Sequence, residues 1–132
     1  QFGLPETGLG ILPAQIAPFV VKRIGLTQAR RLALLGLRFD GKTALDLGVV
    51  HQVAPDDAEL EQQLADTIQQ IKRAAPLASR ATKALLHRTL NEPLTQLLDN
   101  AAEQFARAVA GEEGQEGTMA FIQKRLPNWA EE

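Results

Sequence analysis

The chain has 132 residues, with 45% hydrophobic and 23% charged side chains and a formal net charge of −2. This composition is typical of one folded domain and excludes a disordered tail, while scattered basic residues and few aromatics argue against nucleic-acid binding. No run approaches the roughly 18 apolar residues of a membrane span, and the absence of cysteine excludes disulfides and thiolate metal sites and favours the cytoplasm.

The sequence of the first third of the chain predicts a strand followed by two helices. The opening segment is apolar and extended, and it leads into a Pro-Glu pair followed by glycines. Pro13 stands at the first position of a helix that ends at Gly25, and Pro18 predicts either a kink or a delayed start in that helix. The following segment, QARRLALL, predicts a second helix that ends at Gly36.

A short helix and a second strand are expected next. Asp40 is the predicted N-cap of the helix, which ends at Gly48. The segment VVHQVAP is β-branched and bounded by Gly48 and Pro55, a pattern that predicts a strand. Because two short strands do not form a stable sheet by themselves, we expect the strands and the helices after them to need partners outside this chain.

Helices dominate the remaining sequence. Asp56 and Glu59 have the spacing of a capping box at the start of a helix whose apolar residues recur on one face: Leu60, Leu64, Ile68 and Ile71. Pro76 and Pro93 open the next two helices, and Gly111 ends the second of them. Residues 116–125 predict a last helix, which gives seven helices, two strands and no internal repeat.

Glu6 is the first candidate for chemistry. Pro5 fixes the backbone before it, and Gly8 and Gly10 allow a ligand or another backbone to approach closely. The predicted helix start at Pro13 offers free N–H groups a few residues further on. A carboxylate in such a place can hold a water or transfer a proton. The alternative is a solvated glutamate in a turn.

The other polar candidates carry weaker signals. His51 and His87 lack a partner at metal-ligand spacing, and no nucleophile elbow is present, so both histidines are interpreted as structural or surface residues and no metal is expected. The tail combines aromatic and basic residues that suit a phosphorylated ligand with an aromatic ring: Phe121, Lys124, Arg125 and Trp129. The alternative is an amphipathic helix that docks through its apolar residues.

Four motifs, in chain order, resemble the enoyl-CoA hydratase/isomerase (crotonase) family over essentially the whole chain: FGLPE, LGILP, RIGLTQARRLALLGLRFDGKTALDLGVVHQVAP and EGTMAFIQKRLPNW. The resemblance implies an α/β crotonase-like fold, a ββα spiral, in a parent protein about twice as long. This chain would be the C-terminal part of that single domain and mainly α-helical, with two short strands. Residues 1–54 would end the spiral core, and residues 55–132 would form a helical trimerisation region.

The resemblance also implies roles for four residues. Glu6 matches the second catalytic glutamate of the hydratases, which protonates C2 of a 2-enoyl-CoA, whereas the first glutamate and the oxyanion-hole segments belong to the other half. Ala14 stands where many members have a glycine whose N–H contacts the catalytic water. Phe121 and Lys124 match positions that contact the CoA moiety, commonly of a neighbouring subunit. A homotrimer or a dimer of trimers is therefore expected, with an acyl-CoA substrate and no cofactor.

The segment PAQIAPFVV replaces the glycine-rich run of common hydratases. It resembles the branch acting on 3-branched glutaconyl-CoA substrates, namely methylglutaconyl-CoA from leucine and isohexenylglutaconyl-CoA from acyclic terpenes. The leading hypothesis is therefore a hydratase, a lyase, that is inactive as this chain alone. Two alternatives stay open: an isomerase of the same family, and a non-catalytic domain for CoA binding or assembly.

Overall fold

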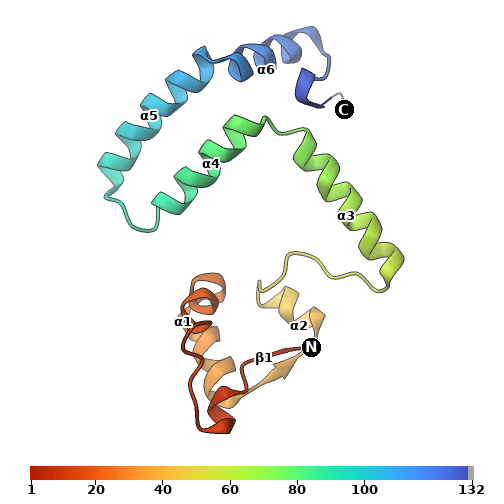
Figure 1. Ribbon diagram of the computed structural model, residues 1–132, viewed down its shortest axis with the longest axis vertical. Coiled ribbons are helices and arrows are strands. Elements are labelled where there is room, and N and C mark those ends of the chain that lie inside the picture. The colour runs from red at the N-terminus through yellow and green to blue at the C-terminus, as the bar shows by residue number, and fades with distance from the viewer. Residues whose placement is uncertain (131–132) are drawn as a thin grey trace. The chain divides into compact units, whose positions relative to one another are not determined.

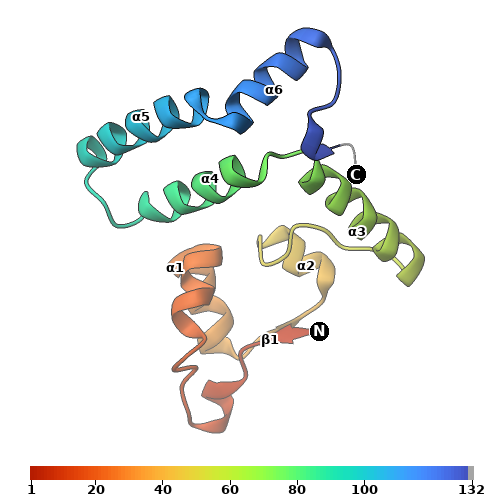
Figure 2. The same cartoon turned by 45° about the horizontal axis from the view of Figure 1, so that its top comes forward.

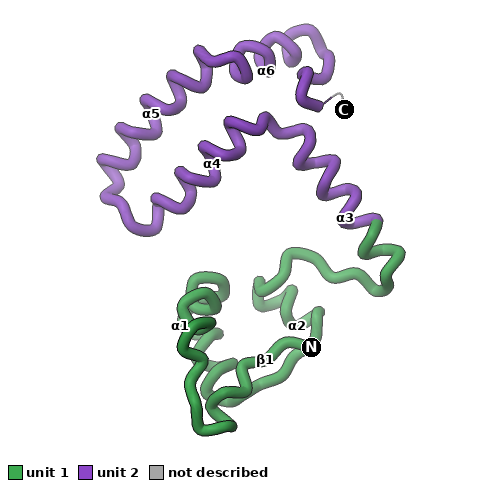
Figure 3. Tube along the Cα trace, in the orientation of Figure 1, with its two compact units in different colours: residues 1–61 green, residues 62–132 purple. Residues whose placement is uncertain are grey.

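The computed structural model describes residues 1–130, and the chain divides into two compact units, Gln1–Glu61 and Gln62–Glu132 (Figure 3). The elements in chain order are β1 (Phe2–Gly3), η1 (Glu6–Leu9), α1 (Ala17–Leu35), β2 (Arg38–Phe39), α2 (Gly41–Asp46), α3 (Asp57–Lys72), α4 (Pro76–Arg88), α5 (Leu94–Ala110), α6 (Glu112–Gln123) and η2 (Asn128–Ala130) (Figure 1). Helices dominate and the strands are short, as the sequence predicts.

The first unit is built around a two-residue antiparallel pairing of β1 with β2. Phe2 lies opposite Phe39 in this register, and the two rings stack with their centroids 5.6 Å apart. The buried side chains of the unit come from the segment after β1, from α1 and from α2: Leu4, Ala29, Leu32 and Ala44. The unit therefore has a small core, made mostly of small and medium-sized residues.

Helix α1 unites the two helices that the sequence predicts on either side of Gly25. It begins at Ala17 rather than at Pro13, because Pro18 lacks an N–H and is tolerated only in the first turn of a helix. At Gly25 the backbone has φ 76° and ψ 161°, a conformation open to glycine and strained for other residues, and the helix bends there into an elbow. Gly36 ends α1 in the left-handed conformation, as expected.

The predicted strand over residues 49–55 is wrong. This segment has no strand conformation, and β2 lies earlier in the chain. The N–H groups of Val49 and Val50 both bond to the carbonyl oxygen of Ala44 at the end of α2, and the Val49 carbonyl accepts from the Nε of Arg23 at 3.2 Å. An extended, β-branched segment becomes a strand only beside another strand, and residues 1–130 place none there.

The second unit consists of helices that fold back on one another. Helix α4 runs alongside α5, and α5 continues into α6 through a bend at Gly111 (Figure 2). The last helix begins at Glu112, earlier than the predicted residue 116. Gly114 permits this early start, because a Cβ at this position would lie 2.1 Å from the carbonyl oxygen of Ala108.

Large apolar side chains remain exposed on both units. The chain exposes 10450 Å² in all, whereas two separate globular units of these lengths would expose roughly 8,000 Å². The stripe predicted on α3 forms, but every member of it is at least 43% exposed: Leu60, Leu64, Ile68 and Ile71. The apolar faces that the sequence predicts are therefore present and remain uncovered by the described residues.

Candidate active site

Glu6 is the first residue of η1, directly after Pro5, and its side chain is half-buried. The short helix is closed by Gly10 in the left-handed conformation, and the N–H of Ile11 bonds back to the Glu6 carbonyl at 3.1 Å. The Oε2 atom of the carboxylate is shielded from solvent, yet no donor among residues 1–130 bonds to it. A buried acceptor without a partner is costly and marks a place where a water or another donor belongs.

An apolar cavity of about 390 Å³ lies inside the elbow of α1. Its wall is made by both halves of the helix and by the residues on either side of Glu6, namely Leu4 and Thr7, whereas Glu6 itself is not part of the wall. Thr7 also ties η1 to α1, because its hydroxyl donates to the Ala33 carbonyl at 2.7 Å. The motif that holds the carboxylate is thus fixed against an apolar, bent helix.

Ala14 is exposed and precedes the helical part of this region. Its N–H donates to the Leu12 carbonyl at 2.8 Å across a tight turn at Pro13. The helix start expected at Pro13 is therefore displaced to Ala17, and the N–H of Ala14 is engaged in the turn. A role for this N–H beside a catalytic water stays a prediction.

Phe121 and Lys124 lie at the C-terminal end of α6. Phe121 is 85% exposed, and Lys124 is the C-cap residue with φ 54° and ψ 38°. Lys124 is also exposed, so its ammonium group is accessible to an anion. Met119 and Ile122 are exposed too, and Ala120 is the buried residue of this helix. The alternative interpretation, in which the apolar residues dock the helix, stays open as a contact with further protein.

The chain turns back along α6 after Lys124, and one carboxylate holds this turn. Glu116 accepts two hydrogen bonds from the Arg125 guanidinium, at 2.6 and 2.8 Å, and one from the N–H of Asn128 at 2.9 Å. These bonds, with that of Arg125 first, lower the pKa of Glu116 from 4.5 to about 2. We refer to residues 124–130 as the C-terminal hook.

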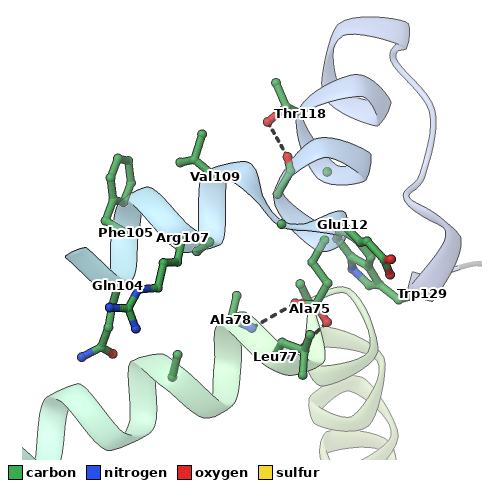
Figure 4. A pocket seen from close by; sticks show the side chains of 16 residues that line it. Ala75, Leu77, Ala78, Gln104, Phe105, Arg107, Val109, Glu112, Thr118 and Trp129 are labelled. Atoms are coloured by element: carbon green, nitrogen blue, oxygen red, sulfur yellow. Dashed lines mark hydrogen bonds between the residues drawn. The ribbon is translucent and has the colours of Figure 1, made fainter. Parts of the chain in front are cut away.

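The hook ends on Trp129, which closes one side of a cavity of about 590 Å³ between α4, α5 and α6 (Figure 4). Its indole N–H donates to the Arg73 carbonyl at 3.2 Å. The ring lies against Gly117, where a Cβ would come within 3.1 Å of it. Glu113 also lines this cavity, and its two carboxylate oxygens accept the first free N–H groups of α4, those of Leu77 and Ala78.

The candidates thus fall into two groups. Glu6 and Ala14 belong to the first unit, and Phe121 and Lys124 to the second. Sequence reasoning missed Glu116, because only the chain reversal brings it to Arg125, nine positions later. The capping patterns in the sequence indicate only where helices begin. The glycines on either side of Glu116 are the one sequence signal that another part of the chain packs closely against this stretch.

Both histidines lie outside these two groups and are exposed. His51 is exposed and lies 3.1 Å from the guanidinium of Arg23, measured to its Nε2 atom. Among residues 1–130 no cluster of three or more His, Asp or Glu side chains could hold a metal ion. In the same part of the chain, every helix is too short or too polar to cross a membrane.

Comparison with known proteins identifies the family. The model of the enoyl-CoA hydratase/isomerase family matches residues 1–132. This chain therefore belongs to the enoyl-CoA hydratase/isomerase family, in agreement with the motifs of the sequence. Its helices and its two short strands are part of the crotonase fold.

Three relatives illustrate the match. AtuE of Pseudomonas aeruginosa is 64% identical with a TM-score of 0.96, covering 98% of this chain and 50% of that one. An enoyl-CoA hydratase/isomerase of Marinobacter aquaeolei is 61% identical with a TM-score of 0.95, covering 98% and 49%. The 2,3-dehydroadipyl-CoA hydratase of Escherichia coli (strain K12) is 33% identical over 130 residues, 98% of this chain and 51% of the relative. The chain spans about half the length of these relatives.

Proposed function

We propose that this chain is the C-terminal part of a single crotonase domain whose complete form hydrates a 2-enoyl-CoA. Residues 1–54 would complete the spiral core of that domain, and residues 55–132 would supply helices for contacts between subunits. The half-length match to the relatives and the exposed apolar faces of both units support this proposal. The complete protein would be an enoyl-CoA hydratase, a lyase, while this chain alone would be inactive.

The reaction assigns a defined step to Glu6. Water adds through its oxygen to C3, the C2=C3 electron pair moves onto the thioester oxygen as an enolate, and C2 then takes a proton. Glu6 would donate that proton, and the proton released by the water would restore the acid. N–H donors and a second carboxylate from the other half of the domain would stabilise the enolate and orient the water.

The observation that carries the proposal is the unpaired Oε2 atom of Glu6. This atom is shielded from solvent, and no donor among residues 1–130 reaches it. A carboxylate that served only the fold would be expected to have a partner when buried. A carboxylate that holds a water and releases a proton needs instead an oxygen atom without a partner in the protein.

The substrate is proposed to be a 3-branched glutaconyl-CoA, from leucine or from acyclic terpenes. The PAQIAPFVV segment supports this branch through its resemblance to it, and it forms the turn at Pro13 and the first half of α1. Two residues of that half, Val20 and Val21, line the apolar cavity of the elbow. Identities of 64% and 61% to two structures, against 33% to the Escherichia coli hydratase, also support a distinct branch.

Assembly and CoA binding are proposed for the second unit. Phe121 and Lys124 would contact the CoA moiety, the lysine through a phosphate and the exposed ring through an apolar or aromatic surface. The exposed apolar faces of α5 and α6 would lie between subunits of a homotrimer or a dimer of trimers. A soluble acyl-CoA substrate and the absence of any cysteine favour the cytoplasm.

The test is Glu6→Gln in the complete protein. Because glutamine cannot donate the proton, we expect turnover of a 2-enoyl-CoA to fall by about 10²–10⁴-fold, with little change in the affinity for CoA. Steady-state hydration kinetics and equilibrium binding of CoA measure the two quantities. Glu61→Gln, on the exposed side of α3, is the matched control and should behave as the wild type.

The products distinguish the alternatives. A 3-hydroxyacyl-CoA product supports the hydratase, whereas an isomeric enoyl-CoA with a shifted double bond supports the isomerase of the same family. Binding of CoA without any turnover supports the non-catalytic domain. An unchanged hydration rate in Glu6→Gln removes Glu6 from the mechanism.

A further inference from the structure

We infer that Glu116 is the positioning residue for the CoA-binding end of α6, acting through the C-terminal hook. The inference rests on the proposed function, because it assigns to Lys124 a phosphate of the CoA moiety. It adds a residue that touches neither substrate nor reacting atoms. Glu116 would set the position of Lys124 by holding the chain reversal that begins there.

Lys124 is held in a conformation that lysine does not favour. Within residues 1–130 it is the one residue other than glycine with positive φ. A left-handed backbone is unfavourable for a residue with a side chain, and glycine is the usual residue at this position of a helix end. Two backbone bonds hold the turn, from the N–H of Lys124 to Phe121 and from the N–H of Arg125 to Ala120. A further interaction, in addition to these two hydrogen bonds, must therefore offset the unfavourable backbone conformation of Lys124.

The Arg125 guanidinium supplies that additional support. Its Nη1 and Nη2 atoms donate to the two carboxylate oxygens of Glu116, Nη1 also donates to the Leu126 carbonyl, and Nε donates to Gln123. The side chains of Glu116 and Arg125 are 22% and 35% exposed, so this pair is only partly in water. A planar two-bond pair of this kind fixes direction as well as distance.

The same carboxylate fixes the middle of the hook. Glu116 accepts from the N–H of Asn128, which places Trp129 against Gly117 and within reach of the Arg73 carbonyl. The hook is therefore tied at its start by Arg125, at its middle by Asn128 and at its end by Trp129. Removing the charge of Glu116 loosens two of these three ties at once.

The position of Lys124 makes this arrangement relevant to a ligand. Lys124 and Phe121 lie three positions apart on α6, both are exposed, and the structure gives the ammonium group of Lys124 no acidic partner among residues 1–130. An ammonium group and an exposed ring three positions apart in the chain suit a ligand that carries both a phosphate and an aromatic base. Such a ligand gains from a lysine whose backbone is already fixed, because less flexibility is lost on binding.

The experiment compares Glu116→Gln with Glu112→Gln in the complete protein. Glu112 lies on the same helix, and no bond to its carboxylate is found among residues 1–130. We expect Glu116→Gln to weaken equilibrium binding of CoA by about tenfold, and to leave binding of a pantetheine thioester without the nucleotide unchanged. It should also raise the acrylamide quenching of Trp129, the only tryptophan of these 132 residues, measured with any tryptophan elsewhere in the complete protein replaced by phenylalanine. KM for the CoA thioester should rise while kcat stays near the wild-type value.

Three further variants keep the test decisive. Lys124→Ala should weaken CoA binding to the same degree, and the double variant Glu116→Gln/Lys124→Ala should be no weaker than either alone, because both remove one interaction. Glu116→Asp keeps the charge and should recover part of the affinity. A general loss of folding would instead impair the pantetheine thioester and kcat together, which overturns the inference.

The outcomes separate this inference from the proposed function. Unchanged CoA affinity in Glu116→Gln overturns the positioning role, whether or not the protein hydrates enoyl-CoA. Loss of affinity without more exposed Trp129 also overturns it, because the hook would not be the cause. A wild-type protein that binds CoA but has no turnover removes the hydratase proposal and leaves the positioning role measurable by binding alone.

Discussion

At the scale of single residues, two glutamates differ in how their carboxylates are paired. The carboxylate of Glu116 has three hydrogen bonds, whereas one oxygen of Glu6 is buried with none among residues 1–130. A fully bonded carboxylate stabilises a fold, and an unbonded one is available for a water or a proton. The difference separates the group that we assign to structure from the group that we assign to chemistry.

The titration of Glu116 gives a prediction at this scale. Because the Arg125 and Asn128 bonds lower the folded-state pKa from 4.5 to about 2, the carboxylate stabilises the hook above pH 4.5, and this contribution is lost as the pH falls from 4.5 to about 2. We expect Trp129 to remain protected from acrylamide above this window and to become more accessible within it.

The control for this titration is Glu116→Gln, in which the other carboxylates titrate as before. In that variant the accessibility of Trp129 should already be raised at neutral pH and should change less between pH 4.5 and 2. Identical curves for the wild type and Glu116→Gln would show that another group controls the hook.

At the scale of the elements, the elbow of α1 depends on Gly25. Its φ of 76° with ψ of 161° lies outside the regions that L-residues prefer. The elbow brings both halves of the helix onto one apolar cavity. A straight helix over the same residues could not line the cavity in this way.

Gly25→Ala tests the elbow. Since alanine is strained at this backbone conformation, we expect the complete protein to lose about 1–3 kcal/mol of unfolding free energy, measured by denaturant unfolding. Gly8→Ala is the matched control, because that glycine has no positive φ and a Cβ there would meet nothing within 4 Å. Equal stabilities for the two variants would mean that the helix is free to straighten at Gly25.

The elements also show what the sequence could and could not predict. Predictions from local sequence patterns are confirmed. Asp40 and Asp56 accept the N–H groups of Thr43 and Glu59 as the predicted helix caps, and Gly36 ends α1. The strand predicted at residues 49–55 failed, because strand formation depends on a distant neighbour rather than on local residue types. Likewise, no local pattern could pair Glu116 with Arg125 across a chain reversal.

At the scale of the whole molecule, the surface is larger and more apolar than a self-sufficient fold allows. The chain exposes 10450 Å², and residues such as Phe105 and Phe121 are at least 72% exposed. Apolar surface of this extent requires further protein to cover it. We propose that these faces are covered by the part of the protein that corresponds to the unmatched half of the relatives.

The isolated chain provides the prediction at this scale. We expect the 132-residue polypeptide alone to lack measurable hydratase activity, because removing even one oxyanion donor costs about 10²–10³-fold in rate. It should also bind a hydrophobic dye strongly. Adding a polypeptide equivalent to the other half of a relative should reduce dye binding. Turnover by the isolated chain near the rate of the complete protein would contradict the division of the site that we propose.

The central claim, that Glu6 delivers the proton to C2, is tested most directly by hydrating a 2-enoyl-CoA in D₂O with the complete protein. We predict one deuterium at C2 of the 3-hydroxyacyl-CoA product with the wild type, formed at the rate of turnover. In Glu6→Gln the rate of deuterium incorporation should fall by about 10²–10⁴-fold, while CoA binding is retained. Incorporation at an unchanged rate in Glu6→Gln would contradict the assignment.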